Sequence, residues 1–187
     1  MTSPELSITA SAAFRATIVR ESLRHLCSPC AGFMLGRYSP ETGSARFDFA
    51  LAAITFPDYF GANEGKLKVL PRFLHAADAT AKAFDRVLMG LWAAWDNPWQ
   101  VGDIREERHE TLVMQSRGIN LPFVATMSIC AREPMWPVLF WQCDRLPHAP
   151  LYASKARVVR IEGPQDNPRR VKAAWRKQLA SKNLPIP

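Results

Sequence analysis

The segment that most constrains the fold runs from residue 70 to residue 95 and reads LPRFLHAADATAKAFDRVLMGLWAAW. Its apolar side chains recur every three or four residues, the spacing that places side chains on one face of an α-helix. Pro71 suits the first turn of such a helix, and the sequence DNP at residues 96–98 is expected to end it. The pattern predicts one long helix with a stripe formed by Phe73, Ala77, Ala81, Phe84, Leu88, Leu91 and Trp95.

Two further helices and a hairpin are predicted before residue 120. Residues 11–26 carry a helical apolar stripe, with arginines mostly to one side of it. The sequence SPETG at residues 39–43 is typical of a turn and lies between two short apolar segments within residues 31–60, which predicts a hairpin or a pair of strands. A third helix is predicted from Asp103, as its N-cap, to about Gln115.

The last part of the chain is predicted to form strands and one final helix. Three apolar segments, at residues 121–130, 137–143 and 151–161, have the composition of strands. The final helix is expected to begin with Asn167 as N-cap and Pro168 at the first helical position. The fold class predicted by this order is α+β: N-terminal helices, a small antiparallel sheet and a basic C-terminal helix.

The length of 187 residues is compatible with one domain. We assign residues 1–166 to a single α+β domain and residues 167–187 to a basic C-terminal helix and tail. The N-terminal segment lacks the pattern of a signal peptide, and no run approaches the ~20 apolar residues of a membrane span. A cytoplasmic protein with reduced cysteines and no membrane partner is therefore expected.

Positive charge is concentrated near the C-terminus. The formal net charge is +7, and residues 1–154 contain 15 basic and 15 acidic groups, since two of the 17 acidic residues, Glu162 and Asp166, lie beyond them. A one-sided basic segment indicates a polyanionic partner such as nucleic acid, and the alternative is a solubilising tail. The nine basic residues beyond 154 are Lys155, Arg157, Arg160, Arg169, Arg170, Lys172, Arg176, Lys177 and Lys182.

Trp175 stands among the basic residues of the final helix. It is either the side chain that anchors this helix to the core or an aromatic contact to nucleic acid. The candidate nucleic-acid-binding residues are accordingly Lys155, Arg157, Arg160, Arg169, Arg170, Lys172, Trp175, Arg176 and Lys177.

A Cys-x-x-Cys pair, Cys27 and Cys30, is the candidate metal site. Structural zinc needs four ligands, usually two close pairs, and Cys130 and Cys143 are too far apart in sequence to form a second close pair. The expectation is no cofactor, or at most a structural zinc at Cys27 and Cys30. Buried thiols without metal remain one alternative, and a redox dithiol, which would normally follow a strand, remains another.

No catalytic motif is visible in the chain. There is no Gly-x-Ser-x-Gly, no glycine-rich phosphate loop and no pair of histidines at metal-binding spacing. The cluster REERHE, which contains His109, has the composition of a solvated helical face. The chain is therefore predicted not to be an enzyme.

The order of these segments resembles the large subunit of type IV CRISPR–Cas effector complexes. The matching pieces are Cys27 and Cys30 after an N-terminal helix, FPDYF at residues 56–60, LPFVATMS at residues 121–128 and ARVVRI at residues 156–161. The family's second cysteine pair is missing. The resemblance implies a subunit that binds crRNA and target DNA with other effector subunits, recognises a protospacer-adjacent motif and helps to open the duplex.

A second resemblance is to JAB/MPN-type isopeptidase domains. CAGFMLGRYSPETG, from Cys30 onward, is similar to their Gly-Gly-x-Leu-Leu-Gly strand, and MGLWAAWDNPWQVGD, from Met89 onward, occupies the place of their metal-binding loop. Trp92, Ala94 and Trp95 stand around the expected His-x-His, and Pro29 stands near the expected Glu. This resemblance implies an inactive protein-interaction scaffold that lacks the catalytic zinc.

Overall fold

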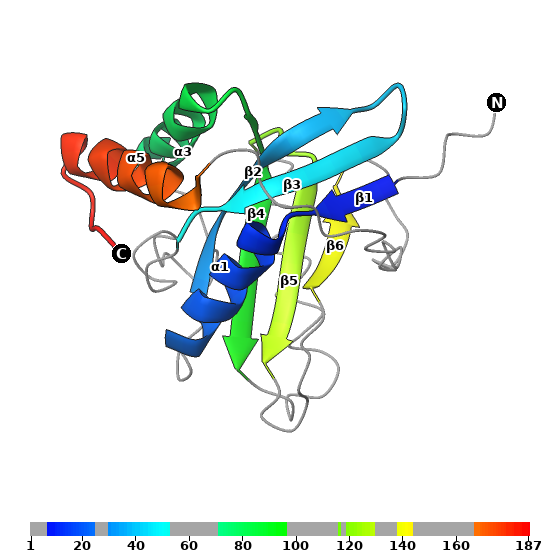
Figure 1. Ribbon diagram of the computed structural model, residues 1–187, viewed down its shortest axis with the longest axis horizontal. Coiled ribbons are helices and arrows are strands. Elements are labelled where there is room, and N and C mark those ends of the chain that lie inside the picture. The colour runs from blue at the N-terminus through cyan, green and yellow to red at the C-terminus, as the bar shows by residue number, and fades with distance from the viewer. Residues whose placement is uncertain are drawn as a thin grey trace.

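The computed structural model of the chain describes residues 7–24, 30–52, 71–96, 116, 119–129, 138–143 and 167–187. Within these ranges the helices are α1 (Ala12–Arg24), α3 (Pro71–Ala83) and α5 (Pro168–Ser181). The strands are β1 (Ser7–Ala10), β2 (Cys30–Ser39), β3 (Ser44–Ala50), β4 (Val87–Asp96), β5 (Phe123–Ile129) and β6 (Val138–Gln142). They form one sheet in the order β1-β3-β2-β4-β5-β6, which confirms the α+β class (Figure 1).

The sheet is mixed, so the expectation of an antiparallel sheet is only partly correct. β2 pairs antiparallel with β3 and β4, and β5 pairs antiparallel with β6. β1 and β3 run parallel, as do β4 and β5. A parallel pair of strands needs a long connection between them, and both parallel pairs have one. α1 and β2 lie between β1 and β3 in the chain, and residues 97–122 lie between β4 and β5.

The predicted N-terminal helix and hairpin are both confirmed. Ser11 caps α1, because its Oγ accepts a hydrogen bond from the backbone N–H of Phe14 at 3.0 Å. The Ser11 hydroxyl in turn donates to the backbone carbonyl of Asp48 on β3, which fixes the start of α1 against the sheet. The turn between β2 and β3 contains Gly43 with a φ of 61°, a conformation that glycine adopts without steric cost.

The long helix predicted over residues 70–95 is wrong in its second half. α3 ends at Ala83, and the chain continues as strand β4. Asp85 has a φ of 51°, and the N–H of Arg86 bonds back to the carbonyl of Ala81 at 3.0 Å, as in a Schellman helix end. β4 is a central strand of the sheet, and its successive residues from Met89 to Ala94 are buried, so both faces are covered there and the sequence is continuously apolar instead of alternating.

The predicted C-terminal helix is confirmed as α5. The Asn167 Oδ1 accepts from the N–H of Arg169 at 2.9 Å, and Pro168 is the first helical residue, as expected. Val171, Trp175 and Leu179 lie on one side of α5 and join the hydrophobic core, and α5 packs against α3. Residues 167–187 are therefore packed onto the same core as the rest of the described chain and are not a detached tail (Figure 1).

The other predicted elements fall in two groups. The strand segments at 121–130 and 137–143 are confirmed as β5 and β6. The helix predicted from Asp103 to Gln115 and the basic strand predicted at 151–161 lie outside the described residues. Among the helices that are described, none has the length and apolar character needed to cross a membrane.

Candidate cationic pocket

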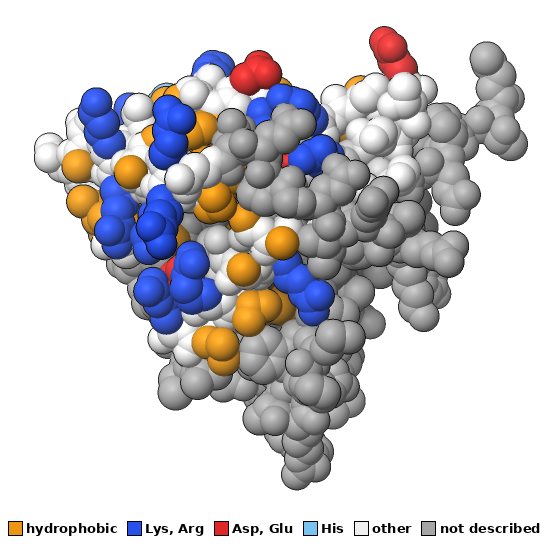
Figure 2. Space-filling model, viewed as in Figure 1, with side chains coloured by type: hydrophobic (Ala, Val, Ile, Leu, Met, Phe, Trp, Pro, Cys, Tyr) orange, Lys and Arg blue, Asp and Glu red, His pale blue; other side chains and the backbone are white. Residues whose placement is uncertain are grey.

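The basic face of α5 is turned partly towards α1. Of the nine candidate nucleic-acid-binding residues, six lie on α5, whereas Lys155, Arg157 and Arg160 lie outside the described residues. Lys and Arg side chains gather over α1 and α5 on the face shown in Figure 2. The six α5 residues take three different positions: towards α1, away from it, and into the core.

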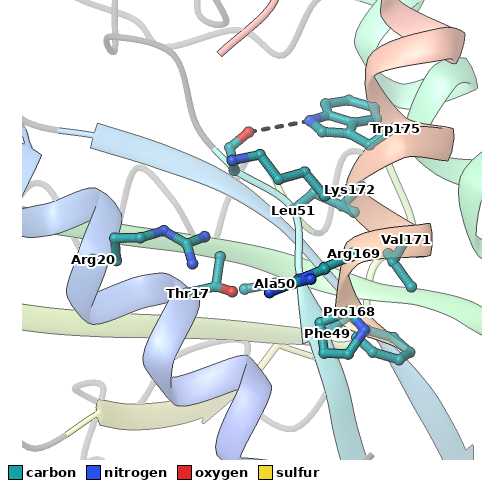
Figure 3. Close-up of a pocket in the computed structure, with 11 residues that line it drawn as sticks. Thr17, Arg20, Phe49, Ala50, Leu51, Pro168, Arg169, Val171, Lys172 and Trp175 are labelled. Atoms are coloured by element: carbon teal, nitrogen blue, oxygen red, sulfur yellow. Dashed lines mark hydrogen bonds between the residues drawn. The ribbon is translucent and has the colours of Figure 1, made fainter. Parts of the chain in front are cut away.

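Arg169 and Lys172 point towards α1 and line a cavity of about 110 Å³. Figure 3 shows them extending from α5 while Arg20 extends from α1 to meet them. Thr17 of α1 also borders the cavity. The floor is apolar and is formed at the end of β3 and by the buried side of α5; its larger side chains are Phe49, Leu51, Val171 and Trp175. We call this cavity, with its basic rim and apolar floor, the cationic pocket.

Arg170, Arg176 and Lys177 are exposed and do not line the cationic pocket. Arg176 donates from Nη2 to the carbonyl oxygen of Pro187 at 2.8 Å, so part of its hydrogen-bonding capacity is used within the chain. Arg170 and Lys177 are seven residues apart, about two helical turns, so they share one side of α5. These two residues therefore form a separate basic surface on the same helix.

Trp175 anchors α5 to the core. Its side chain is 1% exposed, and its Nε1 donates to the backbone carbonyl of Ala52 at 3.2 Å. Its ring also meets Phe33 of β2 edge-on, with 6.2 Å between ring centroids. Of the two roles considered for Trp175, the anchoring role agrees with this burial, whereas stacking on an external base does not, because neither face of the ring is exposed.

Arg20 and Arg24 of α1 complete the positive charge, although the sequence analysis did not include them among the site residues. Both donate to Oε1 of Glu21, from Arg20 Nε at 3.0 Å and from Arg24 Nη1 at 3.4 Å. Glu21 is 1% exposed, whereas the two arginine side chains are 45% and 53% exposed. The buried carboxylate thus restrains two guanidinium groups that remain open to solvent. The alignment of the arginines on one side of α1 was the feature of the sequence that could have identified Arg20 and Arg24 as site residues.

The positive charges are close enough to influence one another. The pKa of Lys172 is lowered from 10.5, first by desolvation and then by the nearby Arg176, Arg20 and Arg24, with Glu21 acting in the opposite direction. No acidic side chain among the described residues forms an ion pair with Arg169 or Lys172. An anion bound in the cationic pocket would relieve this repulsion.

The candidate metal site is only half described, because Cys27 lies outside the described residues. Cys30 is the first residue of β2 and is 1% exposed. Burial raises the pKa of its thiol to about 11, although the Ser22 hydroxyl hydrogen-bonds to it and acts in the opposite direction. Zinc is bound by the thiolate form, so a metal at Cys30 would have to displace a proton held by this environment.

No metal-binding cluster is brought together in the part of the chain that the structure describes. No group of three or more His, Cys, Asp or Glu side chains there could hold a metal ion. His109 lies outside the described residues, as does Cys130, which was considered as a partner of Cys143. Asp48 is buried between Arg86 and Arg46, at 2.6 Å and 2.7 Å from their Nε atoms, and this arrangement joins β3 to the end of α3.

The chain matches no family model and no curated protein. Among solved structures it is similar to the solution structure of protein DSY2949 from Desulfitobacterium hafniense. The TM-score is 0.45 and the identity is 13%, over 72% of this chain and 83% of that chain. The functional interpretation therefore depends on the residues described above.

Proposed function

We propose that this chain is a non-catalytic, nucleic-acid-binding subunit of a ribonucleoprotein complex. The observation that carries the proposal is the meeting of Arg20 from α1 with Arg169 and Lys172 from α5 at one pocket, in the absence of a pairing carboxylate on α5 among the described residues. Phosphate groups are the usual partners of such clusters, because each contact also releases a counterion. Phosphate contacts position a protein on nucleic acid without reading sequence.

The finer part of the proposal comes from the resemblance to the type IV CRISPR large subunit. It assigns crRNA and target DNA as the nucleic acids, other effector subunits as protein partners and the cytoplasm as the location. In such a complex the subunit contributes to recognition of the protospacer-adjacent motif and to opening of the duplex. Contacts to base edges would have to come from residues other than the phosphate-binding cations.

The test compares two double variants that remove the same charge. Arg20→Ala with Lys172→Ala alters the cationic pocket, whereas Arg170→Ala with Lys177→Ala alters the separate basic surface of α5. Each phosphate contact contributes about 0.9 to the logarithmic salt slope for duplex DNA, so the pocket variant should flatten the slope by about 1.8. The other variant should leave the slope within error of the unmodified protein.

Two outcomes would contradict this proposal in different ways. If neither variant changes affinity or slope for duplex DNA and single-stranded RNA, the basic residues of α5 form a solvated surface. If only the Arg170 and Lys177 variant flattens the slope, nucleic acid binds α5 but not at the cationic pocket. Purification from the host should also yield a discrete RNA together with other subunits.

A second candidate is an inactive JAB/MPN-like interaction scaffold, and one observation favours it. β2 and β4 are neighbours, with Cys30 opposite Ala94 and Gly32 opposite Trp92. This register brings the two segments that resemble the family's metal-bearing strand and loop to the same end of the sheet. The positions carry alanine and tryptophan where ligands would be needed. A stoichiometric protein partner retained after nuclease treatment, and also by the Arg20 and Lys172 variant, would favour this candidate.

A further inference from the structure

The floor of the cationic pocket closes the pocket and offers almost no surface to a ligand. Each of its larger side chains is no more than 3% exposed: Phe49, Leu51, Val171 and Trp175. A ligand in the pocket therefore contacts the rim, where charged side chains of α1 and α5 reach the surface (Figure 3). The rim, and not the floor, determines what the pocket can bind.

The volume of the pocket suits one small anion. It measures about 110 Å³ and forms a recess that is neither enclosed nor flat. A cavity of about 150 Å³ holds a benzene molecule of about six heavy atoms, so the pocket has space for roughly four or five. A phosphate group consists of one phosphorus and four oxygen atoms. The pocket therefore has room for one phosphate group and not for the sugar or the base attached to it.

The shape of the recess favours a phosphate at the end of a chain over one inside it. A phosphate diester carries a substituent on two of its oxygens, and both substituents would have to leave through the open side. A phosphate monoester has three oxygens without a substituent, which can face the three rim cations Arg20, Arg169 and Lys172. Only its fourth oxygen then leads out to the solvent.

The charge at the rim favours the same group. Arg20 is paired with the buried Glu21 at 3.0 Å, whereas Arg169 and Lys172 form no ion pair with any acidic side chain that the structure describes. A terminal phosphate carries a charge of about −1.5 to −2 at pH 7, and a diester carries only one negative charge. The lowered pKa of Lys172, caused by desolvation and then by neighbouring cations, agrees with a site that lacks negative charge. A terminal phosphate therefore compensates the rim more fully.

Cations beside the pocket indicate what carries this phosphate. Arg24 of α1 and Arg176 of α5 are exposed, do not line the pocket and are close enough to Lys172 to act on its pKa. Lys and Arg side chains thus continue over both helices beyond the recess (Figure 2). A nucleic acid strand has further phosphates that can use these cations, whereas a free phosphate ion has none. The surface therefore favours a nucleic acid strand as the carrier.

We infer that the cationic pocket binds the terminal phosphate monoester of a nucleic acid strand, with the phosphate between Arg20, Arg169 and Lys172 and the rest of the strand outside. This inference rests on the proposed function and deepens it, because it selects strand ends among the phosphates that the basic surface can contact. Thr17 borders the recess and supplies a hydroxyl that can donate to a phosphate oxygen.

The first test is anisotropy titration of the full chain with one single-stranded RNA sequence, labelled at an internal base. The RNA carries a 5′-phosphate, a 3′-phosphate or hydroxyl groups at both ends. One phosphorylated form should bind at least about tenfold more tightly than the hydroxyl form, because it adds charge-assisted hydrogen bonds at the rim. Methyl phosphate should compete for this binding at least about tenfold better than dimethyl phosphate. Equal affinities of the three RNA forms would overturn the inference.

The second test removes single charges from α5. Lys172→Ala and Arg169→Ala should each weaken binding of the preferred phosphorylated RNA about tenfold and reduce its advantage over the hydroxyl form. Lys177→Ala removes the same charge from the exposed side of α5, outside the pocket, and should leave both affinities unchanged. An equal loss in Lys177→Ala would mean that the end is not held in the pocket.

A variant that fills the recess separates entry of the phosphate from attraction by the charges around it. Thr17→Leu leaves every charge in place, so it should remove the preference for the phosphorylated end and retain the salt slope for duplex DNA without terminal phosphates. A preference that persists in a folded Thr17→Leu protein would overturn the inference, since the phosphate would not enter the recess.

Failure of this inference is distinct from failure of the proposed function. Duplex DNA binding with the expected salt slope, together with equal binding of phosphorylated and hydroxyl RNA, would retain the proposed function and reject the selection of strand ends. Binding of methyl phosphate without binding of any oligonucleotide would reject both. The ligand would then be a free phosphate monoester or a phosphorylated protein.

Discussion

The indole Nε1 of Trp175 donates a hydrogen bond to the carbonyl oxygen of Ala52 at 3.2 Å, which joins two residues that are 123 positions apart in sequence. Ala52 lies two residues beyond the end of β3, and Phe49 and Leu51 near it contribute to the floor of the cationic pocket. The same contact that attaches α5 to the core thus sets the distance between the basic side chains of α5 and those of α1. The stability of the core and the shape of the pocket are coupled through Trp175.

Trp175→Ala should lower the free energy of unfolding by about 3–5 kcal/mol, the usual cost of truncating a buried aromatic side chain. Trp175→Phe keeps a ring but loses the hydrogen bond, so it should cost about 1–3 kcal/mol. Urea unfolding measures both values, and Lys177→Ala on the exposed side of α5 should stay within about 0.5 kcal/mol of the unmodified protein. Unchanged stability of Trp175→Ala would mean that α5 does not depend on this anchor.

Asp48→Ala should lower the free energy of unfolding by about 3–5 kcal/mol, because it leaves the buried guanidinium of Arg86 without its carboxylate. The matched control is Asp78→Ala, which breaks the exposed pair between Asp78 and Lys82 on α3 and should cost less than about 1 kcal/mol. The two variants are compared by urea unfolding at pH 7. Equal effects would show that burial does not determine the importance of the Asp48 pair.

Lys172→Gln should reduce the increase of stability with pH in the alkaline range. The pKa of Lys172 is lower in the folded chain than its ordinary 10.5, so between these two pKa values the unfolded chain binds more protons and stability rises with pH. Urea unfolding of both proteins at several pH values up to 10.5 measures the difference between them. Identical pH profiles would mean that neither desolvation nor the neighbouring cations lower the pKa of Lys172 in the folded chain. Polyanion binding by the unmodified protein should weaken over the same interval, as Lys172 loses its charge.

Cys30 should resist alkylation in the folded protein. A thiol with a pKa of about 11 is ionised in only about one molecule per thousand at pH 8, and its side chain is also buried. Iodoacetamide labelling followed by peptide mapping should find Cys30 modified in urea but not under native conditions. Cys143, which is buried as well, serves as the comparison. Rapid native labelling of Cys30 alone would indicate local opening at the start of β2.

The purified protein should contain no tightly bound zinc, or at most one equivalent that depends on both Cys27 and Cys30. Any such zinc should disappear in Cys27→Ser and remain in Cys143→Ser. Cys30 is level with Ala94 and Met127 at one end of the sheet, whereas Cys143 follows Gln142, which pairs with Phe123 at the other end. Elemental analysis measures the zinc content of the unmodified protein, Cys27→Ser and Cys143→Ser. A full equivalent that survives Cys27→Ser would place the metal at other ligands.

The sequence predicts elements that are governed by local signals and fails where packing decides. The Asn167 cap with Pro168 fixes the start of α5, and the turn at Gly43 fixes the hairpin. β4 was missed because a strand that is covered on both faces has no alternation, and its apolar residues also fit a helical period. Gly90 was a feature of the sequence that argues against a helix and for a strand at this point. A Cβ there would lie 1.8 Å from the carbonyl oxygen of Phe123, so this position in the sheet requires glycine.

Only the part of the cationic pocket that α5 contributes could be predicted from the sequence. The basic residues of α5 were visible as a cluster, but nothing local indicates that Arg20, about 150 positions earlier, faces Lys172. Whether Arg20 and Lys172 lie near each other depends on how α1 and α5 are arranged around the end of β3. The burial of Trp175 was one of two open alternatives, because a tryptophan in a basic helix has the same sequence signature in both roles.

The dependence of α5 on Ala52 also has a consequence for biosynthesis. A ribosome produces the chain from its N-terminus, so α1 and the β2–β3 hairpin emerge well before Trp175 exists. Until α5 is released, Phe49 and Leu51 lack the cover of Val171 and Trp175, and Arg20 of α1 has neither Arg169 nor Lys172 near it. The cationic pocket therefore cannot form until α5 has left the ribosome and has docked beside the end of β3.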